Sequence, residues 1–354
     1  MPSCEENDLQ SMLRAQACDF CARILKEDGL MPQGDEGLLL LRFRALKGAG
    51  YPGILIPTEM GGEGGGWAEA AIVIEELALA DPVLAMMLLS HLVCTAGLLL
   101  WADGRQAADL LPPLARCDVL GAVALTEPEA GTDFADLRTS LERKGEACYA
   151  SGNKCFVTNT APGEESGLLA FLKGPEGIAA AYISSSSPGL HLAHRYRFSG
   201  WEGLPNHALV LQDCAFPAGN LLREGMVRDD LLSLFDGAAL LVAAMAAGMA
   251  RACLETVSRY AGERRQGGRA LAGHQALYFR MSDMATSIES MKISLQAAAG
   301  RLDAGDPCHC ELCMLKLFVS GKLEEIASSA VELAGGYGYT LKRRQRPHRE
   351  RQGR

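Results

Sequence analysis

Leu125-Thr-Glu-Pro-Glu-Ala-Gly-Thr-Asp133 marks the point where the pattern of the chain changes from helical to extended. An apolar run that ends at Leu125 leads into it with the length and composition of a β-strand. Pro128 interrupts strand pairing and Gly131 permits a turn, which places Thr126 at the strand end and Thr132 in the following loop. Two hydroxyls and a run of free backbone N–H groups would suit the edge of a heterocycle or a phosphate. An ordinary hairpin turn also fits this segment.

Length and composition restrict the class of protein. The 354 residues can form two or three packed layers around a large core. Hydrophobic residues make up 48% and charged residues 22%, as in ordinary soluble globular proteins. The net charge of −9 argues against nucleic-acid binding by the main body. No signal-type segment and no uninterrupted run of roughly 20 apolar residues is visible. We therefore expect a cytoplasmic protein with no nucleic-acid partner and no membrane span.

The cysteines offer one possible metal site. The chain has 12 of them, mostly within helical or strand patterns, which favours reduced, buried thiols over a disulfide framework. Cys308-His309-Cys310 together with Cys313 brings four soft ligands into one short segment, as a zinc site would. No second close-spaced pair completes a recognised zinc pattern, and a helix N-terminus with incidental thiols explains the cluster as well. We expect no metal.

The hydrophobic period divides the chain into three parts. Helical spacing predicts helices over 8–28, 37–48, 67–78, 82–101 and 106–114, and an extended piece over 51–57. Strand-like runs follow at 119–125, 137–142, 147–157, 167–173, 178–184, 189–193 and 207–212. Helical spacing returns at 226–260, 271–302 and 310–333, and alanine and glycine on the first of these predict close backbone approach.

This order predicts an α+β fold. We expect an N-terminal α-helical domain over 1–118 and a central small β-barrel or sandwich domain over 119–220. A C-terminal α-helical bundle would follow over 221–340, and a basic, disordered tail would occupy 341–354.

Four segments resemble the acyl-CoA dehydrogenase family, and the resemblance runs from about Leu13 to Thr340. The stretch at 125–133 is similar to the family's Leu-Thr-Glu-Pro-x-Ala-Gly-Ser/Thr-Asp signature. The other segments are Ser-Gly-Asn-Lys-Cys-Phe-Val-Thr-Asn at 151–159, Tyr-Ala-x-Glu-Arg-Arg at 260–265 with His-Gln at 274–275, and Glu-Leu-Ala-Gly-Gly-Tyr-Gly-Tyr at 332–339. The resemblance implies the same three-part architecture.

The resemblance also implies that the protein binds FAD. Phe156 would lie beside the flavin ring, and the Thr158 hydroxyl would reach its N5 edge. Arg264 would reach the FAD diphosphate of a neighbouring subunit, because a guanidinium suits a diphosphate. The implied cofactor contacts are Leu125, Thr126, Gly131, Thr132, Phe156, Val157, Thr158, Arg264, Gln275, Glu332, Gly335 and Gly336. The implied substrate contacts are Thr132 and Asp236. Without the resemblance, Phe156 would fit core packing and Arg264 an exposed loop charge.

The implied reaction is oxidation of the Cα–Cβ bond of an acyl-CoA thioester, with electrons passed to an electron-transferring flavoprotein. This chemistry needs a carboxylate that takes the α-proton while the β-hydrogen leaves as hydride to the flavin. The cross-subunit arginine implies a homodimer or homotetramer.

Three departures from the family pattern bear on that activity. The family usually has glutamine where Glu332 stands, and a carboxylate would repel a diphosphate. The phenylalanine expected before Gly268 is replaced by Gly267. The catalytic glutamate is not found. We expect the chain to lack the family's usual C-terminal segment that carries it, and the alternative position of this glutamate matches Ala238, with Ala239 in place of the substrate-site arginine. We assign no catalytic residue.

Two alternatives therefore stay open. One is a family relative with different flavin chemistry, such as a monooxygenase or a desulfinase, which would not need that glutamate. The other is a truncated, catalytically inactive scaffold.

Overall fold

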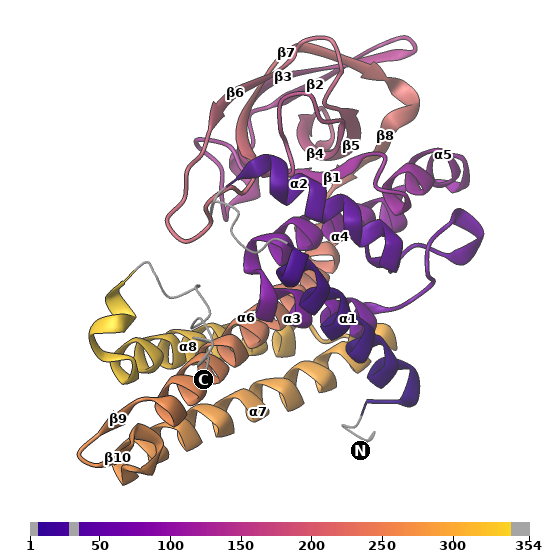
Figure 1. The fold of residues 1–354 in the computed structure, drawn as a ribbon. Coiled ribbons are helices and arrows are strands. Elements are labelled where there is room, and N and C mark those ends of the chain that lie inside the picture. Colours follow the sequence, from indigo (N-terminus) through magenta and orange to yellow (C-terminus); the bar gives the residue numbers. More distant parts are fainter. Residues whose placement is uncertain (1–5, 28–34, 341–354) are drawn as a thin grey trace.

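The computed structural model describes residues 6–27 and 35–340, so the tail predicted at 341–354 lies outside the described residues. The chain forms helices, then a sheet, then helices again (Figure 1). This confirms the predicted α+β fold with its helical, sheet and helical parts. The sheet lies at one end of the molecule, and the long C-terminal helices extend away from it.

The first part is helical. Its elements are α1 (Asp8–Glu27), α2 (Glu36–Ala45), η1 (Leu46–Ala49), η2 (Tyr51–Gly53), η3 (Thr58–Met60), α3 (Trp67–Ala80), α4 (Pro82–Trp101) and α5 (Gly104–Ala115). Aspartates fix the helix starts, since the Asp81 side chain accepts the N–H groups of Val83 and Leu84, and Asp103 forms a capping box with Gln106. The extended piece predicted at 51–57 is wrong. Gly50, with φ of 74°, turns the chain into η2 instead.

The second part is a sheet. Its strands are β1 (Leu120–Ala124), β2 (Ser140–Lys144), β3 (Ala147–Thr158), β4 (Ser166–Gly174), β5 (Gly177–Ser184), β6 (Leu190–Arg195), β7 (Asn206–Pro217) and β8 (Leu221–Met226), with the short helices η4 (Phe134–Asp136) and η5 (Ala218–Asn220). The strand order is β6-β7-β3-β2-β4-β5-β8, and β1 pairs in parallel with β4. β8 was not predicted, because its charged and glycine residues break the alternation of a strand; it pairs with β5 at the sheet edge.

The third part returns to helices. It contains α6 (Arg228–Glu263), β9 (Arg265–Gln266), β10 (Arg269–Ala270), η6 (Leu271–Gly273), α7 (Gln275–Asp303), α8 (His309–Leu333) and η7 (Gly335–Tyr339). A Cβ atom added to Gly248 of α6 would lie 2.1 Å from the carbonyl oxygen of Glu75 in α3. This confirms the predicted close backbone approach. The β9–β10 hairpin lies at the end of the helical part far from the sheet (Figure 1).

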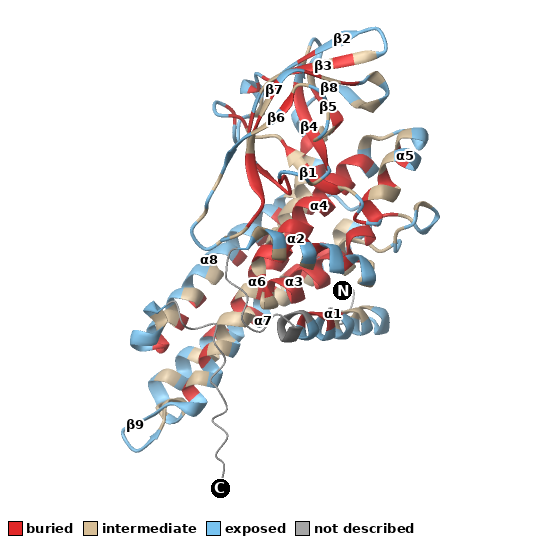
Figure 2. Ribbon diagram, turned by 45° about the horizontal axis from the view of Figure 1, so that its top comes forward, coloured by how far each residue is buried: buried red, intermediate tan, exposed pale blue. Residues whose placement is uncertain are grey.

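Two helices, α4 and α6, are long and apolar enough to cross a membrane by length and composition alone. In the fold, 83% of the most apolar window of α4 and 61% of that of α6 are buried. Figure 2 shows α4 as a mostly buried helix between the sheet and the other helices. Burial in the protein core therefore accounts for the composition of α4.

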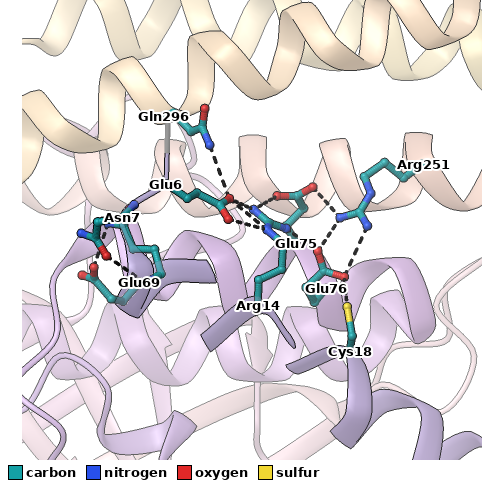
Figure 3. A network of polar contacts seen from close by, with 10 residues as sticks. Glu6, Asn7, Arg14, Cys18, Glu69, Glu75, Glu76, Arg251 and Gln296 are labelled. Carbon is teal, nitrogen blue, oxygen red and sulfur yellow. Dashed lines mark hydrogen bonds and ion pairs between the residues drawn. The ribbon is translucent and has the colours of Figure 1, made fainter. Parts of the chain in front are cut away.

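An ion-pair network joins α1, α3 and α6 (Figure 3). Arg14 of α1 contacts Glu6 at 2.6 Å, Glu75 at 3.0 Å and also Glu76. Arg251 of α6 lies 2.7 Å from Glu75 and contacts Glu76. Burial acts to raise the pKa of the Glu76 carboxyl, but Arg251 and Arg14 outweigh it and hold that pKa below its ordinary value of 4.5. Glu76 thus connects three helices that are distant in sequence.

Glu76→Ala should lower the free energy of unfolding by about 2 kcal/mol at neutral pH, because two half-buried arginines lose one of the two buried carboxylates that they share. Since the folded-state pKa of Glu76 is lowered, its contribution is present above pH 4.5 and is lost as the pH falls through the folded value. Urea unfolding at neutral and acid pH measures both effects. Glu325→Ala, at an exposed ion pair of α8, is the control and should change stability little. A Glu76 variant as stable as the control would contradict the assignment.

Candidate functional site

A buried ion pair fixes the loop that follows β1. Lys154 Nζ of β3 lies 2.6 Å from Glu127 Oε1 and also donates to the carbonyl oxygens of Leu125 at 3.2 Å and Phe171 at 2.6 Å. The Glu127 carboxylate accepts the backbone N–H groups of Arg138 at 2.6 Å and Thr139 at 3.1 Å. Both charged side chains are almost wholly buried. The pair therefore holds both ends of the loop against the sheet.

The charge state of this pair follows from its surroundings. Burial acts to raise the pKa of the Glu127 carboxyl, but hydrogen bonds from Lys154, Thr139 and Arg138 outweigh it and hold that pKa below 4.5. Burial lowers the pKa of Lys154 to about 8, against the opposing effect of the Glu127 carboxylate. Both groups are charged at neutral pH, so the pair acts as a salt bridge there.

The end of β3 presents the residues predicted to face the flavin. The Cys155 N–H donates to the Thr126 carbonyl oxygen at 2.8 Å, which joins the loop to this strand. Phe156 has a φ of 57° and an exposure of 52%, so its ring is displayed instead of entering the core. Val157 is fully buried in the sheet core and Thr158 is buried beside it. Phe156 packs against Tyr196, with ring centroids 4.3 Å apart.

These residues fit a flavin chemically. Asn206 Nδ2 donates to Thr158 Oγ1 at 2.9 Å, and within the described part of the chain the hydroxyl hydrogen of Thr158 has no acceptor. Asn206 Oδ1 is buried and finds no hydrogen-bond partner among the residues that the structure describes. A heteroaromatic ring with a nitrogen acceptor can pack against an exposed aromatic side chain and accept a hydrogen bond from a free hydroxyl group. Phe156 and Thr158 offer these two contacts.

The loop also meets α6, where the predicted substrate contacts lie. Phe134 stacks on Phe235, with ring centroids 5.4 Å apart and an interplanar angle of 10°. Thr132 is exposed and lies two residues before Phe134, while Asp236 follows Phe235 directly. The fold thus brings the segments of Thr132 and Asp236 together. The sequence pattern assigned no role to these two rings or to Lys154, although Lys154 lies within the motif at 151–159.

Five of the predicted cofactor contacts lie elsewhere: Arg264, Gln275, Glu332, Gly335 and Gly336. They gather at the hairpin end of the helical part, where Arg280 of α7 pairs with Glu332 of α8 at 2.6 Å. Tyr337 of η7 lies 6.1 Å from Tyr260 of α6 between ring centroids. A helix as long as α6 spans about 50 Å. The loop beside the end of β3 meets α6 near its start, at Phe235, whereas Arg264 follows the last residue of α6. One chain therefore does not bring the two groups together, and β3 and the β9–β10 hairpin lie at opposite ends of the molecule (Figure 1).

Two of the sequence departures have a structural explanation. The Arg280 guanidinium offsets the negative charge of Glu332, which lowers its repulsion toward a diphosphate. Gly267 and Gly268 have φ values of 60° and 80°, as a two-residue turn between β9 and β10 requires. Ala238, at the alternative position of the catalytic glutamate, is a half-buried methyl group on α6.

Family comparisons agree with this architecture. Three family models match the chain. Residues 7–118 match the N-terminal domain of acyl-CoA dehydrogenases, residues 122–214 match the middle domain, and residues 229–352 match the C-terminal domain. The chain belongs to the acyl-CoA dehydrogenase family. The last match also corrects the expected end of the resemblance at Thr340, because it continues into the basic tail outside the described residues.

Known relatives cover most of the chain. An acyl-CoA dehydrogenase of Bacillus subtilis (strain 168) is 31% identical over 339 residues, covering 93% of this chain and 88% of the relative. An acryloyl-CoA reductase (NADH) of Anaerotignum propionicum is 32% identical, covering 84% of this chain and 77% of the relative. The solved structure of butyryl-CoA dehydrogenase from Megasphaera elsdenii has a TM-score of 0.86 at 28% identity, covering 95% of this chain and 90% of that one. The helical and sheet parts of this acyl-CoA dehydrogenase family member thus have the arrangement of a solved relative.

The buried pair predicts a strong coupling between its two residues. Lys154→Met and Glu127→Gln should each lower the free energy of unfolding by about 3 kcal/mol, because each leaves one buried polar group without its partner. The double variant should lose clearly less than the sum of the two, since no unpaired charge remains. Urea unfolding of the four proteins measures the coupling. Additive losses would show that the two side chains do not depend on each other.

Proposed function

We propose that the protein is an FAD-dependent oxidoreductase that oxidises the Cα–Cβ bond of an acyl-CoA thioester. Electrons would then pass to an electron-transferring flavoprotein, and we place the protein in the cytoplasm. The observation that carries the proposal is the displayed Phe156 ring and the Thr158 hydroxyl beside a loop that the Glu127–Lys154 pair fixes. Relatives named for butyryl-CoA and isobutyryl-CoA favour a short acyl chain as the first substrate to test.

Each residue group has a distinct part in this proposal. Bound FAD would accept the hydride from the β-carbon. Phe156 would exclude water from the ring, and Thr158 would donate a hydrogen bond to its N5 edge. Thr132 and Asp236 would orient the thioester, and the Phe134–Phe235 stack would border its path. Leu125, Thr126 and Gly131 would contact the cofactor through the loop.

A second copy of the chain would complete the cofactor site. The group around Arg264 lies too far from Phe156 to serve the same flavin, and the distance along α6 supports a role at the flavin of a partner. Tyr278 and Phe279 leave apolar side chains of α7 exposed. Such a surface favours association, and we propose a homodimer or homotetramer.

One observation favours a second candidate function. Ala238 and Ala239 can neither remove nor hold a proton, and no catalytic glutamate is identified among the described residues. A flavin monooxygenase or a desulfinase would not need that carboxylate, and an inactive scaffold would need no chemistry. The assays below separate these alternatives.

The flavin assignment is tested first by absorption. We expect the purified protein to show a flavin band and to bleach when an anaerobic sample is titrated with butyryl-CoA. A flavin band without bleaching by any acyl-CoA would refute the dehydrogenase and favour the oxygen-dependent alternatives. A colourless protein that does not take up added FAD would refute every flavin function and favour the inactive scaffold.

The cross-subunit assignment predicts the effect of a single arginine. Arg264→Ala should weaken FAD binding by at least about tenfold, because a charge-assisted hydrogen bond to a diphosphate is lost. Arg265→Ala is the matched control. Arg265 donates to the Gly268 carbonyl oxygen at 3.2 Å within the hairpin, so the variant that lacks it should bind FAD as the wild type does. Fluorescence titration of the apoprotein measures both. Equal affinity of the two variants would argue against a role of Arg264 at the cofactor.

A further inference from the structure

A chain of three polar side chains joins α6 to the first turns of α8. Asp236 Oδ1 lies 2.6 Å from His309 Nδ1, and His309 Nε2 lies 3.6 Å from Cys313 Sγ. The contacts use opposite nitrogens of the ring, so the imidazole stands between the carboxylate and the thiol. The side chains therefore do not converge on one point as metal ligands would. This is the order in which a carboxylate orients a histidine base toward a nucleophile.

The position on α8 adds to this arrangement. His309 and Cys313 are four residues apart and lie on the same face of the helix, with the cysteine side chain directed toward the N-terminus. A neighbouring histidine base favours the thiolate form of a cysteine.

The other charges at this end of α8 are largely paired with one another. Arg301 of α7 forms an ion pair with Glu311, and its Nε lies 3.9 Å from Asp306. Asp236 forms its ion pair with His309. The charged groups around the first turns of α8 are therefore His309 with Asp236, and Arg301 with Glu311 and Asp306.

Most other thiols are less able to react. Burial raises the pKa of the Cys94 and Cys117 thiols to about 12. Burial and the Glu76 carboxylate raise the pKa of Cys18 to about 11. Burial also raises the pKa of Cys308, which precedes the three-residue chain. Cys313 combines exposure with a histidine partner, and Cys310 on the same turn is exposed without a hydrogen bond to its thiol among the described residues.

We propose that Cys313 is a redox-modification site that reacts with low-molecular-weight disulfides. Its thiolate attacks one sulfur of RS–SR, so that a Cys313–S–SR bond forms while the RS–SR bond breaks. The displaced RS⁻ takes up the proton that His309 removed from Cys313, and RSH leaves. Cys313 is thereby oxidised and one RS group is reduced to its thiol. This exchange requires a thiolate and access to the sulfur. It uses neither flavin nor thioester, so it does not depend on the proposed function.

The experiment measures thiopyridone release from 4,4′-dithiodipyridine at neutral pH by stopped-flow absorbance. The wild type should show a fast phase of one thiol per chain, roughly tenfold faster than the remaining thiols. Cys313→Ser should lose this phase, whereas Cys310→Ser, the matched exposed control, should keep it. Mass spectrometry of the peptides should place the first pyridyl group on Cys313, and oxidised glutathione should modify the same residue.

His309→Gln tests the role of the base. It should slow the fast phase roughly tenfold and move its half-maximal rate to higher pH, a change that altered packing alone would not cause. The proposal is overturned if the fast phase persists in Cys313→Ser, disappears in Cys310→Ser, or keeps its rate and pH profile in His309→Gln. Circular dichroism of each variant confirms that it is folded.

Discussion

The contact between Lys154 and Glu127 is the constraint on which the site depends. A buried lysine is costly unless it is paired, and here one carboxylate and two carbonyl oxygens surround its ammonium group. The same carboxylate accepts two backbone N–H groups at the far end of the loop. The sheet thus holds a loop that is otherwise irregular, and the loop in turn meets α6 through Phe134 and Phe235. A loop held by a rigid sheet keeps its binding groups in fixed positions.

The molecule separates the two ends of its proposed cofactor site. The ring-side residues lie at the sheet, and the diphosphate-side residues lie at the hairpin beyond the end of α6. Because a long helix stands between them, neither group can complete the site alone. This separation makes assembly part of the proposed function, and the exposed apolar side chains of α7 offer a surface for it. At this end the Arg280 guanidinium offsets the negative charge of the Glu332 carboxylate.

Much of the fold could be predicted because its period changes twice, and the loop at 125–133 could be placed because Pro128 and Gly131 interrupt a strand. The pairing of Lys154 with Glu127 could not be predicted, since the two residues stand 27 positions apart and meet only through the sheet. β8 escaped prediction because charged residues mask its pattern. The Asp236–His309–Cys313 arrangement joins α6 to α8, and local spacing indicated only the His309 and Cys313 part of it. Local patterns predicted local structure, and contacts across the fold required the coordinates.

A crystal structure of the protein crystallised with FAD tests most directly the central claim that two subunits form one flavin site. The account predicts flavin density with the ring against Phe156, its N5 edge within hydrogen-bond distance of Thr158, and Arg264 of a second subunit at the diphosphate. The loop should keep its position, with Lys154 still bound to Glu127. Density for FAD held by a single chain, or a flavin ring placed away from Phe156 and Thr158, would contradict it.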